Sequence, residues 1–402
     1  MISFHKYVWG KRRMFFMLLL CIMVSNCVQE FDFKTEDFES ILVIKASITN
    51  EQKYHRIQLS RTYKFEDDGP LVEQGATVKV VENTNVVYIF EEIFPGTYQS
   101  TQEFSAEPNK NYQLSIETRD GGVYMSEEQV LPSENSIIDK VYPKRMFNNN
   151  GIEGVGILID SYDVTGNSQY YRYQFEETYR ITADFWARVD LTTSLEYVNR
   201  PDGQERCFNG GASNTIIITD TSSLLEDKVS GLLLRFIDAE DIRVADRYSI
   251  LVRQFVQSRE AYGFYNTINN FSESESLFSQ LQPGFVSGNI FSTLNENERI
   301  LGFFEVTSVT EKRMFFSRED LISDLPRFSP TCDRVIPRQE STETEDEFLS
   351  RLRALIRSGN VKFLEEIRDP NSESGRTYVF VPRGCGDCTV YGQSTIPDFW
   401  ED

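Results

Sequence analysis

The chain has 402 residues, a formal net charge of −21 and a hydrophobic fraction of 40%. That hydrophobic fraction is sufficient for packed cores and excludes a wholly disordered chain. The negative charge excludes nucleic acid as a partner, because phosphates and carboxylates repel each other.

The first 26 residues have the pattern of an export signal. Four basic residues and no acidic residue precede an apolar stretch over residues 14–24. This stretch of about 11 residues is too short for a hydrocarbon core, which needs about 20, but it suits a signal peptide. It ends at 24–27 (VSNC), the pattern that a lipoprotein signal peptidase recognises, although Asn26 is a less usual residue before the cleavage point. The alternative is an ordinary secretory signal followed by an accidental cysteine.

Cleavage before Cys27 would make this cysteine the lipidated first residue of the mature protein. Two or three acyl chains anchor a protein firmly, whereas one binds weakly. Residues 27–40 then form a lipidated tether, in which Glu30 and Asp32 predict a surface-export signal. The alternative for these two acids is a merely solvated tether. Loss of four basic residues from a chain of charge −21 leaves −25, so we expect the body to stand off an anionic bilayer.

The cysteines of the mature body predict disulfides. Cys207, Cys332, Cys385 and Cys388 are an even number in an exported chain. A bond between Cys385 and Cys388 would close a very small ring, so we expect Cys332 to pair with Cys385 or Cys388, and Cys207 with the other. Zinc binding or redox chemistry at 385–388 (CGDC) is the less favoured alternative, since no second CxxC or histidine pair accompanies it.

Histidine is scarce, and this limits the chemistry that the chain can perform. His55 is the only histidine outside the signal, which leaves little room for Ser-His-Asp or Cys-His catalysis. No motif selects a pair of carboxylates, a metal site or a cofactor. We therefore expect no catalytic residue, no metal and no cofactor.

Residues 41–134 predict an immunoglobulin-like β-sandwich. Short segments that alternate apolar and polar residues are separated by turn signals such as Pro95-Gly96 and Gly121-Gly122. The alternating or apolar segments are 41–44, 55–60, 77–81, 86–90 and 112–117.

Residues 135–402 predict a larger β-rich domain with a few short helices. Strands are expected at 169–176, 214–219, 231–237, 247–256 and 307–316. A helix is expected at 259–271, with Tyr262, Tyr265, Ile268 and Phe271 on one face. A second helix begins at the capping box 344–347 and ends before Gly359. The whole chain is therefore predicted to be mainly β.

Several short segments, in their order along the chain, are similar to a family of Bacteroidota lipoproteins classed as a domain of unknown function. They are 59–62 (LSRT), 75–78 (GATV), 96–98 (GTY), 112–114 (YQL), 121–122 (GG), 170–173 (YYRY), 176–178 (EET), 247–254 (RYSILVRQ), 287–290 (SGNI), 301–304 (LGFF), 385–388 (CGDC) and 397–400 (PDFW). Members are commonly encoded beside TonB-dependent receptors. The resemblance implies an outer-membrane location facing the cell exterior, and carries no catalytic motif.

Three functions remain open at this stage. The first is a non-catalytic accessory or substrate-binding subunit of a TonB-dependent receptor or another outer-membrane β-barrel. The second is an adhesin or glycan-binding module, suggested by 30 Phe and 19 Tyr, although core packing is the default role of these rings. The third is a surface hydrolase that uses carboxylates. We expect the first, with a lipid anchor in the membrane and a β-barrel as partner.

Overall fold

The computed structural model describes residues 40–63, 69–83, 85–201, 203–273, 286–328, 330–370 and 375–402. The mainly β fold predicted from the sequence is confirmed, with many strands and a few short helices. The signal peptide, Cys27, Glu30 and Asp32 lie outside the described residues, so the predictions made for them stay predictions.

The N-terminal strands form the first sandwich, which we call the N-terminal sandwich, and in it one continuous antiparallel sheet wraps around a single core. They are hydrogen-bonded in the order β1-β2-β6-β5-β4-β7-β8, with β3 beside β2 and β9 beside β7. Alternation explains the burial: Val78 and Val80 of β4 are buried, whereas Lys79 between them is exposed. The strands are β1 (Leu42–Thr49), β2 (Arg56–Arg61), β3 (Leu71–Val72), β4 (Thr77–Glu82), β5 (Val86–Phe94), β6 (Thr97–Ser100), β7 (Asn111–Glu117), β8 (Val123–Ser126) and β9 (Gln129–Val130).

The turn between β5 and β6 requires glycine. Gly96 has φ of 70°, a left-handed conformation that glycine adopts without steric cost. A Cβ atom at this position would also lie 2.6 Å from the carbonyl oxygen of Leu59. The turn therefore lies directly against the end of β2.

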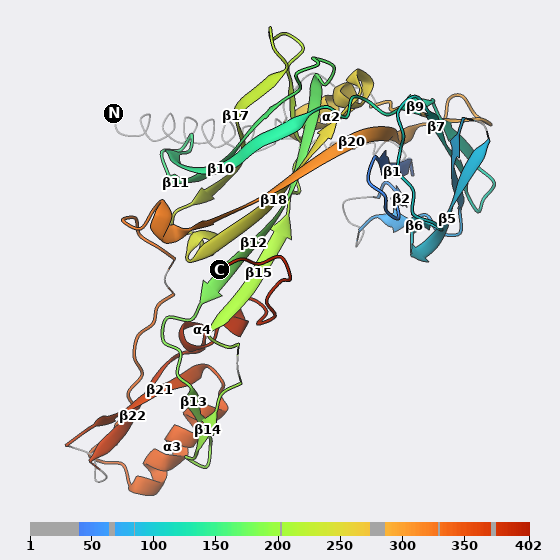
Figure 1. Cartoon of the computed structure of the whole chain (residues 1–402). Coiled ribbons are helices and arrows are strands. Elements are labelled where there is room, and N and C mark those ends of the chain that lie inside the picture. Colours follow the sequence, from blue (N-terminus) through green and yellow to red (C-terminus); the bar gives the residue numbers. More distant parts are fainter. Residues whose placement is uncertain are drawn as a thin grey trace, which may run out of the picture.

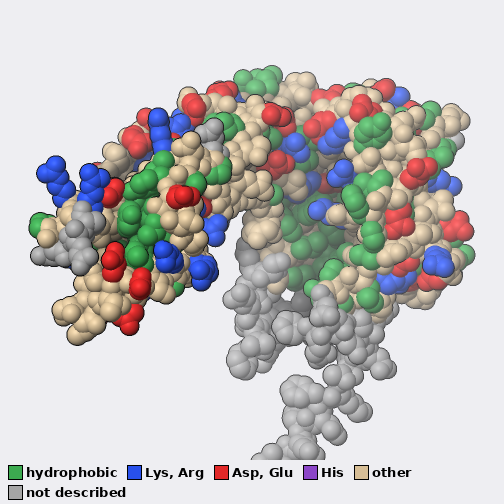
Figure 2. All heavy atoms as spheres, turned by 90° about the horizontal axis from the view of Figure 1, so that it is seen from below, with side chains coloured by type: hydrophobic (Ala, Val, Ile, Leu, Met, Phe, Trp, Pro, Cys, Tyr) green, Lys and Arg blue, Asp and Glu red, His purple; other side chains and the backbone are tan. Residues whose placement is uncertain are grey.

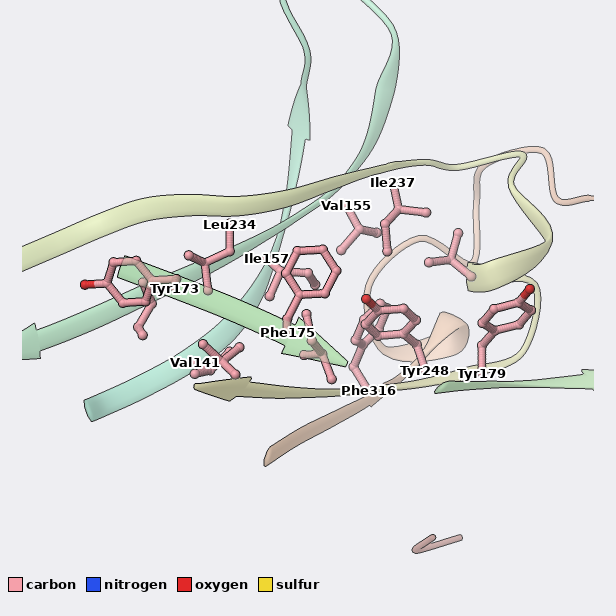
Figure 3. Packing of buried hydrophobic residues seen from close by; sticks show 14 of the residues in the cluster. Val141, Val155, Ile157, Tyr173, Phe175, Tyr179, Leu234, Ile237, Tyr248 and Phe316 are labelled. Atoms are coloured by element: carbon pink, nitrogen blue, oxygen red, sulfur yellow. The ribbon is translucent and has the colours of Figure 1, made fainter. Parts of the chain in front are cut away.

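The middle of the chain forms a second sandwich. One layer is the sheet β10-β11-β17, and the other contains β15, β12, β18 and β20, with β16 beside β12. Figure 3 shows the core between the layers, where Val155, Ile157 and Ile237 face Phe175 and Tyr248. These strands are β10 (Ile137–Phe147), β11 (Glu153–Tyr162), β12 (Tyr170–Thr182), β15 (Arg206–Ala212), β16 (Ile217–Asp220), β17 (Lys228–Asp238), β18 (Arg247–Val256) and β20 (Ile300–Ser317).

Strand β20 joins the two sandwiches into one continuous sheet. Its first half, from Ile300 to Thr307, pairs in parallel with β1, and its second half, from Ser308 to Ser317, pairs antiparallel with β18. Strand β19 (Ile290–Ser292) pairs with β8 in the N-terminal sandwich. Figure 1 shows β20 passing from one sandwich to the other. The sheet thus continues across the sequence boundary at 134/135, and residues far along the chain complete the first sandwich.

Helix α2 (Arg259–Glu273) covers the junction between the sandwiches and confirms the first predicted helix. The expected face is wrong in part. The residues that pack are Ala261, Phe264, Tyr265 and Ile268, whereas Tyr262 donates its hydroxyl hydrogen to Asp220 instead. The packed residues follow the i, i+3, i+4, i+7 spacing of a helix with 3.6 residues per turn. The predicted face used a spacing of three throughout, and such a row of residues drifts around the helix.

A smaller lobe contains the C-terminal segments, at the lower left of Figure 1. Its core contains Leu191, Leu352, Phe363 and Phe380. The predicted capping box is confirmed, with Thr344 as the N-cap of α3. The elements are β13 (Val189–Leu191), β14 (Tyr197–Asn199), α3 (Glu345–Arg357), β21 (Val361–Arg368), β22 (Arg376–Pro382) and α4 (Arg383–Gly386). The described residues also contain the short 3-10 helices η1 (Ile242–Val244) and η2 (Arg318–Asp320) of the second sandwich and η3 (Cys388–Val390) after α4.

Candidate functional site

All four cysteines of the described residues form long-range disulfides. Cys207 of β15 is bonded to Cys388, and Cys332 to Cys385. This is one of the two pairings that the sequence analysis left open, and it excludes a Cys385–Cys388 bond. No thiolate remains among these four cysteines to bind zinc. Cys385 and Cys388 therefore have a structural role, and the Cys207–Cys388 disulfide links the small lobe to the second sandwich.

A cavity of about 200 Å³ lies beside the disulfides and is lined in part by Asp184, Asp246 and Arg327. Burial alone would raise the pKa of Asp246, but hydrogen bonds from Arg180 and Thr182 outweigh it and hold this pKa below its usual range. Asp184 forms an ion pair with Arg327. Asp246 is therefore ionised at neutral pH, which suits a structural ion pair and not a general acid.

A buried ion pair occupies the junction where β20 leaves β1 and joins β18. The guanidinium of Arg172 on β12 donates a hydrogen bond to the carboxylate of Glu305 on β20, and both side chains are almost fully buried. The amide of Gln257 donates to the same carboxylate over 3.0 Å, and the hydroxyl of Tyr265 over 3.2 Å. The Arg172 guanidinium also lies 4.3 Å from the ring centroid of Phe255. This network connects β12, β18, α2 and β20.

His55 is a packed core residue. It is 2% exposed, and its Nε2 atom lies 2.9 Å from the carbonyl oxygen of Phe104. Burial lowers the pKa of His55 to about 4, although the hydrogen bond to Phe104 opposes this shift. The imidazole is therefore neutral at pH 7, enclosed and turned toward a backbone oxygen.

Many of the aromatic rings are buried. The largest fully enclosed side chains include Tyr98, Tyr112, Tyr171, Tyr173 and Tyr248. An enclosed ring cannot stack on a sugar, so these tyrosines serve packing and the composition alone does not favour a glycan-binding surface.

Two loops of the second sandwich carry exposed aliphatic side chains, which we call the apolar tip: Val164, Leu224 and Leu225. Their exposed fractions are 83%, 55% and 106%. Val164 lies between β11 and β12, and the two leucines lie between β16 and β17. Figure 1 shows the loop that leads into β17 at the top of the molecule. This site was not predicted from the sequence, although two adjacent leucines in an otherwise polar loop are a readable signal.

Hydrogen bonds to two acidic residues hold the loops of the apolar tip together. The amide of Asp163 donates to the carbonyl of Asp227 over 3.0 Å, which joins one loop to the other. The carboxylate of Asp163 accepts from Ser168 over 2.6 Å, and that of Asp227 accepts from Tyr171 over 2.7 Å. Burial would raise the pKa of Asp163, but the hydrogen bonds that it accepts hold this pKa below its usual value. The apolar tip therefore has an ordered polar base.

The tether enters at an end of the N-terminal sandwich that also carries exposed apolar side chains. We call these the end patch: Tyr63, Leu71, Val72 and Phe94. Their exposed fractions are 44%, 60%, 45% and 66%. These exposed residues were not predicted from the sequence either. Figure 2 shows hydrophobic side chains on the underside of the molecule among charged side chains of both signs.

No helix among the described residues is long and apolar enough to cross a membrane. Within the same residues, no group of three or more His, Cys, Asp or Glu side chains could hold a metal ion.

Comparisons with known proteins identify a family and little more. No curated protein matches the sequence. The crystal structure of a DUF4785 family protein from Legionella pneumophila is 9% identical, covers 52% of this chain and 50% of its own, and has a TM-score of 0.17. This chain thus spans about half the length of that protein, and the similarity is too low for any structural argument.

The family described as a domain of unknown function (DUF4249) matches residues 28–313. The match includes the N-terminal sandwich, nearly all of the second sandwich and Cys207, and it ends before the segments at 385–388 and 397–400 that the resemblance included. The Cys207–Cys388 disulfide therefore fastens the part beyond the match to the part within it. The chain belongs to the DUF4249 family, a domain of unknown function.

Proposed function

We propose that the protein is a non-catalytic outer-membrane lipoprotein that faces the cell exterior and serves as an accessory or substrate-binding subunit of a β-barrel. The barrel in this proposal is a TonB-dependent receptor or a related complex. Cys27 carries the lipid, and Glu30 and Asp32 direct the chain to the surface. The signal sequence and the family resemblance support this reading.

The observation that carries the proposal is the apolar tip on its ordered base. Three exposed aliphatic side chains on two hydrogen-bonded loops favour a protein contact, since exposed apolar groups gather where partners bind. The base formed by Asp163 and Asp227 fixes the loops before binding, which reduces the entropy lost on association. The tether adds a high local concentration near the membrane, so a small interface suffices.

The test replaces one leucine of the tip by a charged residue. Leu225→Asp introduces a carboxylate where the proposal has an apolar contact, and we expect at least a tenfold loss of β-barrel co-purified from detergent-solubilised outer membrane. Leu294→Asp is the matched control, because Leu294 is also an exposed leucine in a loop, with an exposed fraction of 70%. Absence of any barrel with the wild-type protein, or equal losses with both variants, would contradict the proposed function.

A further inference from the structure

We propose that the end patch rests on the lipid surface that holds the anchor, with Tyr63, Leu71, Val72 and Phe94 at the boundary between headgroups and acyl chains. This inference depends on the proposed function only in requiring the lipid at Cys27. It adds a second membrane contact, made by the folded domain itself, and it fixes which end of the sandwich faces the bilayer.

The four side chains come from segments that lie together at the end of β2. Leu71 and Val72 of β3 pair with Arg61 and Ser60 of β2. The ideal Cβ position of Gly96 lies 2.9 Å from Cβ of Val72, so the β5–β6 turn that follows Phe94 contacts β3. Tyr63 follows β2 by two residues. The four residues therefore come from three adjacent segments at this end of the sandwich.

The same end receives the tether. The amide of Ile41 donates to the hydroxyl of Thr62 over 2.9 Å, and the amide of Thr62 donates to the carbonyl of Ile41 over 2.9 Å. Leu42, the first residue of β1, pairs with Arg61. The point where the tether joins the fold is thus fixed beside the residues that support the end patch.

The length of the tether keeps this end near the anchor. Twelve residues separate Cys27 from Ser40, and a chain of that length spans at most about 45 Å when fully extended. The end patch therefore remains close to the bilayer, where the tether raises its effective concentration at the lipid surface.

Arginine side chains offset part of the negative charge beside the patch. Arg61 forms ion pairs with Glu73, at 2.5 Å, and with Asp120, at 3.5 Å, and Arg119 next to Asp120 is exposed. Glu92 adds a third carboxylate here, which accepts hydrogen bonds from the amides of Gly75 and Gly96. The overall negative charge predicts a body that stands off the bilayer, whereas the two guanidinium groups reduce this repulsion at the end patch. Aromatic and aliphatic side chains with arginine nearby suit the membrane interface.

The test measures how close one side chain comes to lipid. The full lipidated protein is purified, labelled at Phe94→Cys with a polarity-sensitive fluorophore and reconstituted in phosphatidylcholine vesicles that contain a lipid spin-labelled near the headgroup. The four native cysteines of the body are in disulfides, so the introduced thiol reacts selectively. Ile89→Cys is the matched control, because Ile89 is on the same strand, is 55% exposed and lies roughly 16 Å farther along it.

We expect the label at position 94 to be quenched at least twofold more than the label at position 89. Equal quenching at both positions would overturn the inference and leave the anchor intact. A third outcome is that neither label is quenched and that the label at position 94 is shielded from water only when a β-barrel is bound. This result would show that the patch contacts the barrel, and it would also overturn the inference. Protein that fails to float with vesicles would contradict the lipid anchor, and with it both proposals.

Discussion

Cys207 and Cys388 are joined by a disulfide across 181 residues of sequence, and this bond fastens the C-terminal tail to β15. The tail beyond it continues along the same sheet. Gln393 forms a β-bridge with Phe208, and the ring of Trp400 lies 4.8 Å from that of Phe208. The disulfide is therefore the covalent part of a longer contact.

Replacing Cys207 and Cys388 together by Ala should destabilise the protein. In the chain-entropy model a loop of this length corresponds to about 5 kcal/mol, although measured losses are often 2–4 kcal/mol. We expect the free energy of unfolding in urea to fall by about 2–5 kcal/mol, together with faster proteolysis of the tail. The double variant of Cys332 and Cys385 is the comparison, since only 53 residues separate these two cysteines and a smaller loss is expected. An unchanged unfolding midpoint for the Cys207–Cys388 variant would show that the bond is dispensable.

The Arg172–Glu305 pair should be costly to break from one side. Glu305→Gln leaves the buried guanidinium without its counter-charge, and such a change destabilises proteins by about 3–5 kcal/mol. The double variant Arg172→Met with Glu305→Gln removes both charges, keeps an amide oxygen that can accept from Gln257 and Tyr265, and should recover most of that loss. Urea unfolding of the three proteins measures both values. If the double variant is no more stable than Glu305→Gln, the pair contributes through packing and not through charge.

His55 should make the protein less stable in mild acid. Its pKa is about 4 in the folded protein and about 6.5 when unfolded, so the unfolded chain binds the extra proton between these values. Stability due to His55 is complete above pH 6.5 and decreases as the pH falls toward 4, by roughly 2–3 kcal/mol at pH 4.5. His55→Gln retains a donor for the Phe104 carbonyl and cannot titrate. The free energy of unfolding of this variant should change less between pH 4.5 and 7 than that of the wild type. If the two proteins show the same dependence on pH, His55 is not the group that causes it.

Sequence patterns predicted the local structure well. Alternation identified β2, β4 and β7, because one face of each strand is buried and the other is not, and apolar runs indicated β1 and β5. The capping box identified the start of α3, since its hydrogen bonds are formed by residues three apart in the chain. Features that depend on neighbours in sequence could thus be read directly.

The features missed by sequence analysis depend on residues far apart. Nothing in residues 42–49 shows that β1 pairs in parallel with β20, more than 250 residues away. The end patch combines segments that only the fold of β2, β3 and the β5–β6 turn brings together. The two loops of the apolar tip are joined by a hydrogen bond between Asp163 and Asp227, which lie far apart in the sequence. Each of these three features depends on which distant segments are paired, and the periodicity of the sequence does not contain that information.

Replacing Glu30 and Asp32 by Ala should retain the lipoprotein on the periplasmic side of the outer membrane. The two carboxylates follow Cys27 at +3 and +5 and are the proposed surface-export signal. Treatment of whole cells with a protease measures this, and the double variant should be protected while the wild type is degraded. If both proteins are degraded equally, the two acids only solvate the tether.

The lipid anchor supports both proposals, and mass spectrometry of the N-terminal peptide tests it most directly. The mature protein purified from membranes should begin at Cys27, with a mass increased by diacylglycerol and a third acyl chain. Cys27→Ser should lack this mass and disappear from the outer-membrane fraction. A mature chain that begins at another residue, or at an unmodified Cys27, would contradict the account.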